Sequence, residues 1–256
     1  MNNSSLPLLS SKTQKPGAPE PALSLPKGLA FETWDRASPS TARASVPNFD
    51  RLARVYRWME LLTFGPWLER CRCAFLGDLT GCRRAAVLGD GDGRFTAQLL
   101  RANSMIEIDA VDLSAAMLRT LLRRAGQNVA HVHVHCADAR TGQPAKPPYD
   151  LVVTHFFLDC LTEDEVRSLA DRLREILSPS GLWLVSEFAI PEGAFGRWVA
   201  RPVVWLLYRA FGLLTGLAVR KLPDYASALR AAGCTLRKRR SFLRGLLAAE
   251  LWSPAQ

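Results

Sequence analysis

Three glycines at alternate positions, Gly89, Gly91 and Gly93, follow an apolar run of strand length that ends at Leu88. Apolar residues at helical spacing begin directly after them. A strand that ends in glycines ahead of a helix lets a ligand approach bare backbone, opposite the free N–H groups of the helix. A dinucleotide-binding turn needs its third glycine where Arg94 stands, so the spacing weakens the case for a pyrophosphate ligand.

Acidic residues follow the next two apolar segments of strand length. Asp112 ends residues 106–112 and lies 23 positions after Gly89, about where an acid reaches the ribose hydroxyl pair in a doubly wound sheet. Asp138 comes two positions after residues 130–136. The first of these acids is therefore the candidate ligand for a ribose.

Strands and helices alternate in the expected element order. Thr162 and Glu165 form a capping box, which starts a helix because each side chain accepts a hydrogen bond from the other's backbone N–H. Strands are expected over residues 85–88, 106–112, 130–136, 149–154 and 182–188. This alternation predicts an α/β fold with a parallel, doubly wound sheet and right-handed crossovers.

The glycine turn and the acids after it resemble the class I S-adenosylmethionine-dependent methyltransferases. The resemblance covers roughly residues 49–252 and implies a Rossmann-like, mostly parallel, seven-stranded sheet closed by a hairpin over 235–243 and 246–252. It also implies that Asp112 binds the ribose and that Asp138 binds the adenine amino group. The turn departs from the family's acid-x-Gly-x-Gly pattern, because Gly89 stands where many members carry the acid, although Asp90 and Asp92 lie within the turn.

The segment ahead of the glycine turn adds a narrower resemblance. Residues 49–56 match the pattern Phe-Asp-x-x-Ala-x-x-Tyr, as in the first helix of the ubiquinone and menaquinone C-methyltransferase group. In that group the tyrosine lies over the cofactor, which implies the same for Tyr56; an amphipathic helix that buries an aromatic residue is the alternative. A second N-terminal helix is expected from Pro66. The residues expected beside S-adenosylmethionine are Tyr56, Gly89, Asp90, Gly91, Gly93, Asp112, Leu113, Asp138, Ala139, Thr154 and His155.

A sulfonium methyl group is already activated, so the resemblance leaves binding, alignment and the exclusion of water to the protein. If the acceptor is a phenol, an enol or a hydroxyl, a base helps to remove its proton. His155 stands just past the fourth strand, at the carboxyl edge where doubly wound sheets bind ligands, and is the first candidate base. Asp159 is the second. The alternative for His155 is a packed side chain beside the cofactor.

No metal is expected. His131, His133 and His135 alternate along one strand and share a face. No acid or cysteine at ligand spacing completes a metal site, so we expect the three histidines to line a partly exposed sheet face. The six cysteines include no Cys-x-x-Cys pair, which is typical of reduced thiols in a cytoplasmic protein.

Residues 1–45 are rich in serine and proline and lack apolar periodicity, which predicts a disordered tail ahead of one methyltransferase domain over 46–256. The net charge is +9, and residues 195–256 hold eleven of the 33 Lys and Arg residues but only two of the 24 Asp and Glu residues. This region does not resemble a nucleic-acid module, so no nucleic-acid partner is expected.

Residues 195–221 are apolar and edged with arginines. No uncharged run reaches the roughly 18–20 residues that a bilayer span needs. We expect this segment either to form a helical cap over a lipophilic acceptor after the fifth strand or to lie in a membrane interface. An ordinary core helix is the alternative.

Two classes of function fit these observations. The first is a cytoplasmic, membrane-peripheral methyltransferase that acts on a small lipophilic acceptor, such as a quinone precursor or a lipid. The second is a non-catalytic S-adenosylmethionine-binding or membrane-associated partner protein, because the glycine turn has an altered acid. A nicotinamide-dependent oxidoreductase is disfavoured by Arg94 and by the lack of a Tyr-x-x-x-Lys pair. The N-terminus shows no secretory signal pattern, and the sequence makes no prediction of oligomeric state.

Overall fold

The computed structural model describes residues 35–36, 64–143, 147–215 and 222–255 of the 256-residue chain. The chain divides into two units, residues 1–30 and residues 31–256, and all the described residues belong to the second. The expected helix with Tyr56 and most of the expected tail lie outside the described residues. Two residues of that tail, Asp35–Arg36, form strand β1 and pair with β5 (Gly142–Gln143). The extent of the disordered tail stays a prediction.

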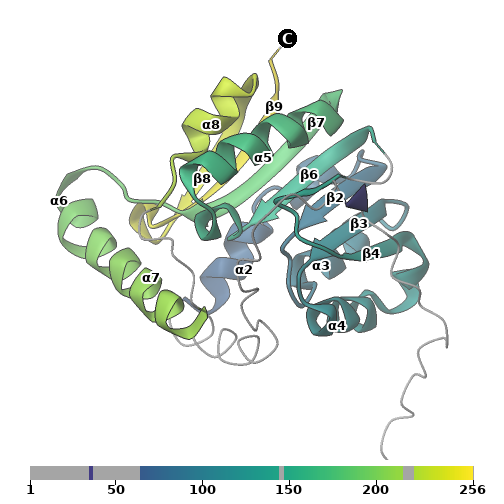
Figure 1. Ribbon diagram of the computed structural model, residues 1–256, viewed down its shortest axis with the longest axis horizontal. Helices are drawn as coiled ribbons and strands as arrows, with labels where there is room; N and C mark the ends of the chain where they lie inside the picture. The colour runs from purple at the N-terminus through teal and green to yellow at the C-terminus, as the bar shows by residue number, and fades with distance from the viewer. Residues whose placement is uncertain (1–34, 37–63, 144–146, 216–221, 256) are drawn as a thin grey trace, which may run out of the picture. The chain divides into compact units, whose positions relative to one another are not determined.

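Seven strands form one sheet in the order β4-β3-β2-β6-β7-β9-β8, visible in Figure 1. Neighbours among β4, β3, β2, β6 and β7 are parallel, whereas β9 is antiparallel to both β7 and β8. The doubly wound, mostly parallel seven-stranded sheet and its closing hairpin are therefore confirmed. The strands are Arg84–Leu88 (β2), Glu107–Asp112 (β3), Val132–Cys136 (β4), Tyr149–His155 (β6), Leu177–Phe188 (β7), Cys234–Phe242 (β8) and Leu247–Pro254 (β9).

Two strand starts differ from the expected ones by two residues or more. The strand expected from residue 130 begins at Val132, because Gly126–His131 forms a 3-10 helix ahead of it. β7 begins at Leu177 instead of Leu182, because the chain leaves the preceding helix directly into the sheet. An irregularity in the β6–β7 register, between Tyr149 and Leu151, takes up the extra residues of β7.

Helices cover both faces of the sheet, because successive strand residues point to opposite sides. Ala85 and Val87 of β2 join one core with residues of α2, α3 and α4, while Ala86 and Leu88 join a second core with residues of α5 and α8. Figure 1 shows α5 and α8 together over the second face. The five helices are Pro66–Arg72 (α2), Arg94–Ala102 (α3), Ala115–Ala125 (α4), Glu163–Ile176 (α5) and Tyr225–Ala231 (α8).

The expected helix starts are confirmed at two positions. Pro66 is the first residue of α2, where its missing N–H leaves no hydrogen bond unmade. At the start of α5, Glu165 Oε2 accepts the Thr162 N–H at 2.8 Å and Thr162 Oγ1 accepts the Glu165 N–H at 3.3 Å, which completes the capping box. Helix α5 is thereby fixed immediately after the loop that follows β6.

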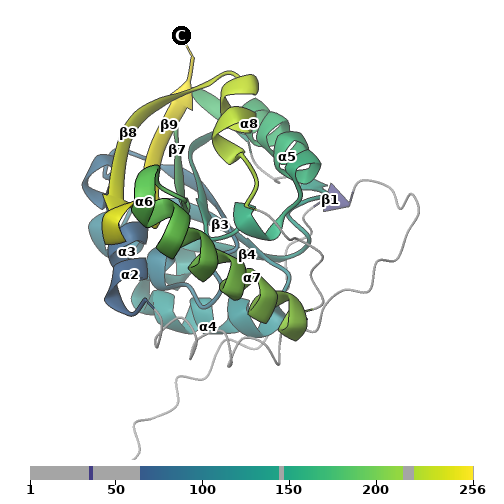
Figure 2. The same cartoon turned by 90° about the vertical axis from the view of Figure 1, so that its left-hand side faces the viewer.

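The apolar segment after β7 is helical throughout its described part. It consists of α6 (Gly193–Phe195), a π-helical turn (Gly196–Ala200) and α7 (Arg201–Thr215), which follow one another as one long rod in Figure 2. Ala200 and Val204 are buried and join the core. This side of the rod agrees with the alternative of an ordinary core helix. The expected cap over an acceptor stays a prediction. Within the described residues, no helix combines the length and the apolar character needed to cross a bilayer.

The strand order creates a switch point at β2. Its neighbours are β3 on one side and β6 on the other, so the chain crosses over β2 on its way from β4 to β6. Open α/β sheets bind ligands outside the carboxyl ends of their strands at such a point. The glycine turn after β2, Asp112 at the end of β3 and His155 at the end of β6 share this edge.

Candidate functional site

The glycine turn leaves β2 with all three glycines at positive φ: +71° at Gly89, +60° at Gly91 and +78° at Gly93. Gly89 and Gly93 are also required by close packing. An added Cβ would lie 2.7 Å from Phe157 Cδ2 at Gly89 and 2.7 Å from Leu121 Cα at Gly93. At Gly91 it would meet no atom of the described residues within 4 Å, so open space lies in front of the middle of the turn. A ligand can therefore approach the backbone at Gly91.

Asp90 caps the helix that follows the turn. Its Oδ2 accepts hydrogen bonds from the Thr96 N–H at 2.8 Å and the Thr96 hydroxyl at 2.6 Å, and its Oδ1 accepts one from the Phe95 N–H at 3.3 Å. Burial raises the pKa of Asp90, although the bonds from Thr96 and the nearby Arg72 act against it. Both carboxylate oxygens thus serve the N-terminus of α3, and the expected contact of Asp90 with the cofactor stays a prediction.

Asp112 is tied to the glycine turn. Its Oδ1 accepts the Ser114 N–H at 2.8 Å, and its carboxylate also accepts a backbone hydrogen bond from Gly91. Burial raises the pKa of Asp112 to about 6, with the neighbouring Asp90 adding to the shift. The structure therefore brings together the open turn and the expected ribose ligand, and the carboxylate is ionised at neutral pH.

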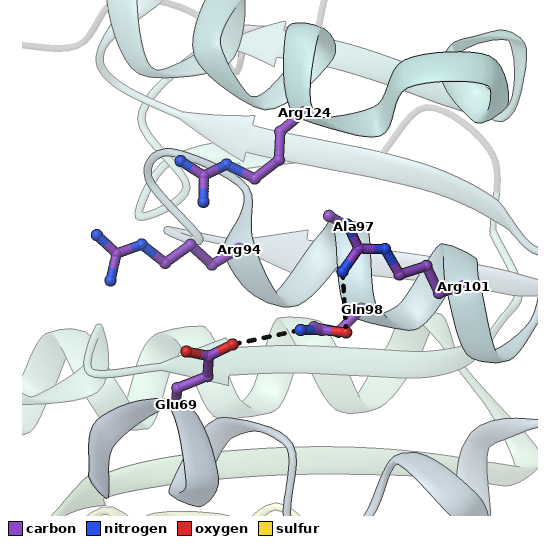
Figure 3. A pocket seen from close by; sticks show the side chains of 6 residues that line it. All are labelled: Glu69, Arg94, Ala97, Gln98, Arg101 and Arg124. Atoms are coloured by element: carbon purple, nitrogen blue, oxygen red, sulfur yellow. Dashed lines mark hydrogen bonds between the residues drawn. The ribbon is translucent and has the colours of Figure 1, made fainter. Parts of the chain in front are cut away.

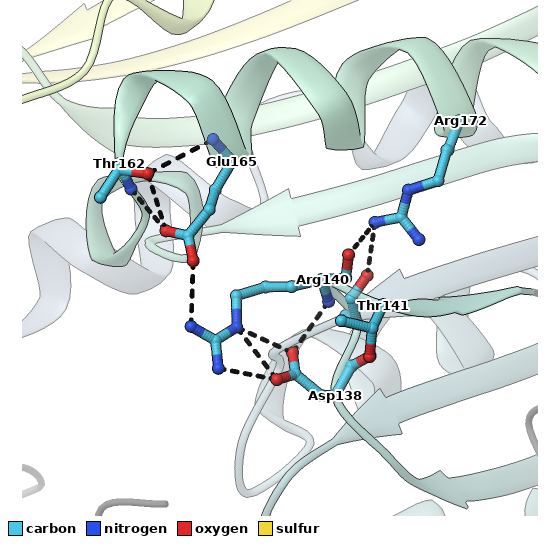
Figure 4. Close-up of polar contacts among 7 residues, drawn as sticks. Asp138, Arg140, Thr141, Thr162, Glu165 and Arg172 are labelled. Carbon is cyan, nitrogen blue, oxygen red and sulfur yellow. Dashed lines mark hydrogen bonds and ion pairs between the residues drawn. The ribbon is translucent and has the colours of Figure 1, made fainter. Parts of the chain in front are cut away.

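Asp138 is held by a bidentate arginine, as Figure 4 shows. Arg140 donates to Asp138 Oδ1 from Nε at 3.0 Å and to Oδ2 from Nη2 at 2.7 Å, while its Nη1 donates to Glu165 Oε1 at 3.1 Å. Burial acts to raise the pKa of Asp138, but the bonds from Arg140 outweigh it and the pKa lies below its usual value. Asp138 therefore stays ionised, and its carboxylate is already engaged by Arg140. The expected contact of Asp138 with an adenine amino group stays a prediction.

The loop that carries Asp138 is fixed from two sides. Arg172 of α5 donates to the carbonyls of Ala139 at 3.2 Å, Gly142 at 2.9 Å and Arg140, so a single side chain orders the loop. On the other side, the Ala137 N–H donates to the Asp112 carbonyl at 3.2 Å. The two acid-bearing loops are thus adjacent, as a single nucleoside site requires.

His155 is buried at the end of β6, only 3% exposed. Among the residues that the structure describes, neither of its ring nitrogens has a hydrogen-bond partner. Its ring meets the Phe95 ring edge-on, with centroids 4.4 Å apart. Burial, together with the nearby charge of Arg72, holds the pKa of His155 well below its usual value. The imidazole is therefore neutral: it can exchange a hydrogen bond with an acceptor molecule, but it is a weak base.

Glu187, at the end of β7, is a site residue that the sequence analysis missed. It is fully buried, and its Oε1 accepts the N–H groups of Phe157 at 3.0 Å and Leu158 at 2.8 Å. Its Oε2 has no hydrogen-bond partner in the described part of the chain. The carboxyl group thus holds the loop that places Phe157 against Gly89. A sequence signal existed, since Glu187 is a charged residue at the carboxyl end of an otherwise apolar strand.

The carboxyl groups of the buried Glu187 and the half-buried Asp159 form a pair. Burial and the proximity of Asp159 raise the pKa of Glu187 well above its usual value. Burial also raises the pKa of Asp159 to about 6, and the Cys160 thiol donates to Asp159 Oδ1 at 3.3 Å. Two carboxyl groups with raised pKa values beside a ligand-binding edge can hold or accept a proton near neutral pH.

The remaining expected cofactor residues are placed as follows. Thr154 is fully buried, and its hydroxyl accepts the Trp183 Nε1–H at 3.1 Å in the sheet interior. Leu113 is 38% exposed directly after Asp112, and Ala139 is buried. Tyr56 lies outside the described residues. The cofactor contacts of these four residues stay predictions.

The three histidines do not share one partly exposed face, and acids do pair with them. His135 is fully buried, with Nε2 2.8 Å from Asp109 Oδ1, and His131 lies in the 3-10 helix ahead of β4. His131 Nδ1 and His133 Nε2 lie 2.6 Å and 3.3 Å from the two carboxylate oxygens of Glu107. The acids belong to the neighbouring strand β3, which spacing within one strand does not reveal. Within the described ranges, no group of three or more His, Cys, Asp and Glu residues is arranged to hold a metal ion.

A polar pocket of about 340 Å³ lies on the outer side of α3 (Figure 3). Its lining comes from α2, α3 and α4: Glu69, Arg94, Ala97, Gln98, Arg101 and Arg124. Asp92 of the glycine turn pairs with two of these arginines, at 3.3 Å from Arg94 Nε and 3.0 Å from Arg124 Nη2. None of the residues expected to bind the cofactor lines this pocket, so it is separate from the site at the strand ends.

Residues 87–183 match a family model described as a methyltransferase domain. No curated protein matches the chain. Among solved structures, the mitomycin 7-O-methyltransferase MmcR is similar over 83% of this chain (TM-score 0.63, 18% identity), and an O-methyltransferase family protein from Burkholderia thailandensis over 82% (TM-score 0.63, 16% identity). CalO1, a methyltransferase in calicheamicin biosynthesis solved with S-adenosylhomocysteine bound, is similar over 81% (TM-score 0.57, 21% identity).

The chain spans 62%, 61% and 60% of these three proteins, respectively. The likenesses show that the fold is the Rossmann-like fold of S-adenosylmethionine-dependent methyltransferases. The matched residues are similar to a methyltransferase domain, and with the bound S-adenosylhomocysteine of CalO1 this likeness supports S-adenosylmethionine as the methyl donor. The narrower resemblance to the quinone C-methyltransferase group stays a prediction.

Proposed function

We propose that the protein is an S-adenosylmethionine-dependent methyltransferase that acts on a small lipophilic acceptor. The observation that carries the proposal is the junction of β2 and β3, where the open turn at Gly91 and the Asp112 carboxylate are joined by a hydrogen bond. Exposed backbone next to an ionised carboxylate at a switch point is what a nucleoside with a free ribose needs. The methyl donor, when bound, supplies an already activated methyl group.

The protein's own residues bind and orient the methyl donor and the acceptor, and they exclude water. Asp112 accepts the ribose hydroxyls, and Asp138 accepts the adenine amino group alongside Arg140. Phe157, held by Glu187, fills the space beside Gly89 and leaves the backbone at Gly91 open to the ligand. His155 and Asp159 are the candidate groups for the proton of a phenol, enol or hydroxyl acceptor. Asp159 is the better base because its pKa is about 6, whereas that of His155 lies well below the usual value.

The lipophilic character of the acceptor is supported by the aromatic residues near the candidate bases. Phe157 is half-buried and lies between His155 and Asp159 in the chain, whereas Phe95, which packs on His155, and Phe156 belong to the hydrophobic core. A quinone precursor or a lipid-like phenol has the required apolar surface. A cytoplasmic location with peripheral membrane contact belongs to the same proposal, because such acceptors partition into bilayers.

Titration calorimetry with S-adenosylhomocysteine tests the cofactor site. We expect Asp112→Ala to weaken binding by about 1–3 kcal/mol, the range for a lost hydrogen bond to a charged acceptor. The matched control is Asp171→Ala, which removes an exposed acid from α5. An unchanged affinity of the Asp112 variant contradicts the ribose assignment, and the absence of binding to the unaltered protein contradicts the proposed function.

A non-catalytic S-adenosylmethionine-binding protein is the second candidate. One observation favours it: Asp90 lies in the turn, but both of its carboxylate oxygens are used in capping α3. Tight cofactor binding without transfer of a radiolabelled methyl group to any of a panel of phenols, quinols and lipids is the result that distinguishes it from the enzyme.

A further inference from the structure

The rod formed by α6, the π-helical turn and α7 presents an apolar surface to solvent. Four of its residues form what we call the outer face: Trp198 (74% exposed), Val199 (44%), Trp205 (56%) and Leu206 (63%). They make up half of the large apolar residues that are exposed in the described part of the chain. Single exposed apolar residues need no explanation, but a cluster with two tryptophans marks an interaction surface.

The outer face is held in place by the opposite side of the rod. Ala200 and Val204 are 0% and 4% exposed and join the hydrophobic core, and the partly buried Val203 and Leu207 pack against it. At the start of the rod, a Cβ added at Gly196 would lie 1.6 Å from the Pro191 carbonyl oxygen, so helix and preceding loop are in close contact. The rod therefore cannot turn its tryptophans inward without losing this packing.

The charge of the rod is of one sign. Arg197, Arg201 and Arg209 flank the outer face, and no acidic residue occurs between Glu192 and Asp224. All three arginines are exposed. The Arg209 guanidinium lies over the Trp205 ring, 5.2 Å from its centroid, so a cation accompanies one of the exposed aromatic rings. A partner that covers this face must be apolar beneath the tryptophans and anionic beneath the arginines.

We propose that the outer face binds the surface of an anionic lipid bilayer, with the rod parallel to the membrane plane. Tryptophan rings partition to the boundary between headgroups and acyl chains, because they carry an apolar body and one N–H donor. Arginines reach from the same helix to lipid phosphates while their alkyl stems stay in the apolar layer. Each arginine near an anionic surface strengthens partitioning by about fivefold.

This inference deepens the proposed function, since a bilayer would present a lipophilic acceptor to the enzyme, but it does not depend on that function. The surface is on the rod, whereas cofactor binding uses the strand ends. A failure of lipid binding and a failure of cofactor binding are therefore separate results.

The test uses the purified full chain with vesicles of phosphatidylcholine alone or mixed with phosphatidylglycerol, separated by flotation. We expect binding to the mixed vesicles, at least tenfold weaker binding to the neutral ones, and loss of binding as salt is raised. The double variant Trp198→Ser/Trp205→Ser should lose at least tenfold in affinity for the mixed vesicles. Met105→Ser is the matched control, because Met105 is 76% exposed in the loop before β3.

Circular dichroism and urea unfolding of each variant show whether its fold is intact, and calorimetry with S-adenosylhomocysteine tests the cofactor site separately. Absence of binding to either vesicle overturns the proposal, and so does equal binding by the double tryptophan variant and the unaltered protein. A second copy of the chain is the other occupant of comparable chemistry. A dimer that the double variant abolishes, with no vesicle binding by the unaltered protein, would assign the outer face to self-association and overturn the lipid proposal.

Discussion

Glu187 offers the sharpest test of how the candidate site is held together. Its Oε1 accepts two backbone N–H groups, and its Oε2 has no partner among the described residues. Replacement by alanine leaves the Phe157 and Leu158 N–H groups without their acceptor inside the protein. Each unpaired buried group costs about 1–3 kcal/mol, so Glu187→Ala should lower the free energy of unfolding by about 2–6 kcal/mol, before the cavity is considered.

Replacement of Glu187 by glutamine should instead raise the free energy of unfolding. The amide oxygen can accept the same two N–H groups, and the amide is neutral at every pH, so it never repels the Asp159 carboxylate as an ionised Glu187 does. Because the pKa of Glu187 is raised in the folded protein, the folded state favours the protonated form. The stabilising contribution of protonated Glu187 is complete below the pKa that this side chain has in the unfolded chain. It is lost as the pH rises through the raised pKa of Glu187 in the folded protein. Glu187→Gln does not titrate, so its advantage over the unaltered protein should grow with pH, by at most about 1.4 kcal/mol per pH unit.

Urea unfolding followed by the fluorescence of the buried Trp183 and Trp252, at pH 5, 6, 7 and 8, measures both effects. Asp171→Asn, an exposed change on α5, is the control for a lost charge. Two results refute the reasoning: equal losses of stability in the alanine and glutamine variants, or a glutamine variant that is destabilised with no dependence on pH. Either would mean that Glu187 is ionised and that its charge, not its oxygen atom, holds the loop.

Two further predictions concern the glycine turn and its carboxylate. Affinity for S-adenosylhomocysteine should fall about tenfold as the pH is lowered from 7 to 5, because the pKa of Asp112 is about 6 and ribose hydroxyls donate to the ionised form. Calorimetry that gives the same dependence of affinity on pH for Asp112→Asn would contradict this. Gly93→Ala should destabilise the protein by more than about 2 kcal/mol, because the added Cβ would lie 2.7 Å from the Leu121 backbone. Gly91→Ala should cost only about 1–2 kcal/mol of positive-φ strain, but it should weaken cofactor binding. Equal unfolding midpoints for these two variants would show that packing at Gly93 does not matter.

The sequence by itself determined the order of the elements and the position of the turn. Periodicity of two or 3.6 residues marks a strand or a helix locally. Pro66, the capping box at Thr162 and Glu165, and the glycines after Leu88 act on backbone within a few residues of themselves. Because parallel strands end at one edge, the sequence could also predict that Asp112 and His155 share that edge.

The tertiary structure alone decided how the polar side chains are paired. His133 and His135 of β4, and His131 just ahead of it, meet the acids of β3 because the two strands are neighbours, although the partners are 24 to 26 positions apart in the chain. The same holds for Glu187, whose backbone partners are 29 and 30 positions away. Which side of the rod became its exposed outer face was likewise decided by the tertiary structure. Hydrogen bonds and burial act over a few ångströms, so they depend on which segments become neighbours in space, and residue spacing along one strand or helix does not specify those neighbours.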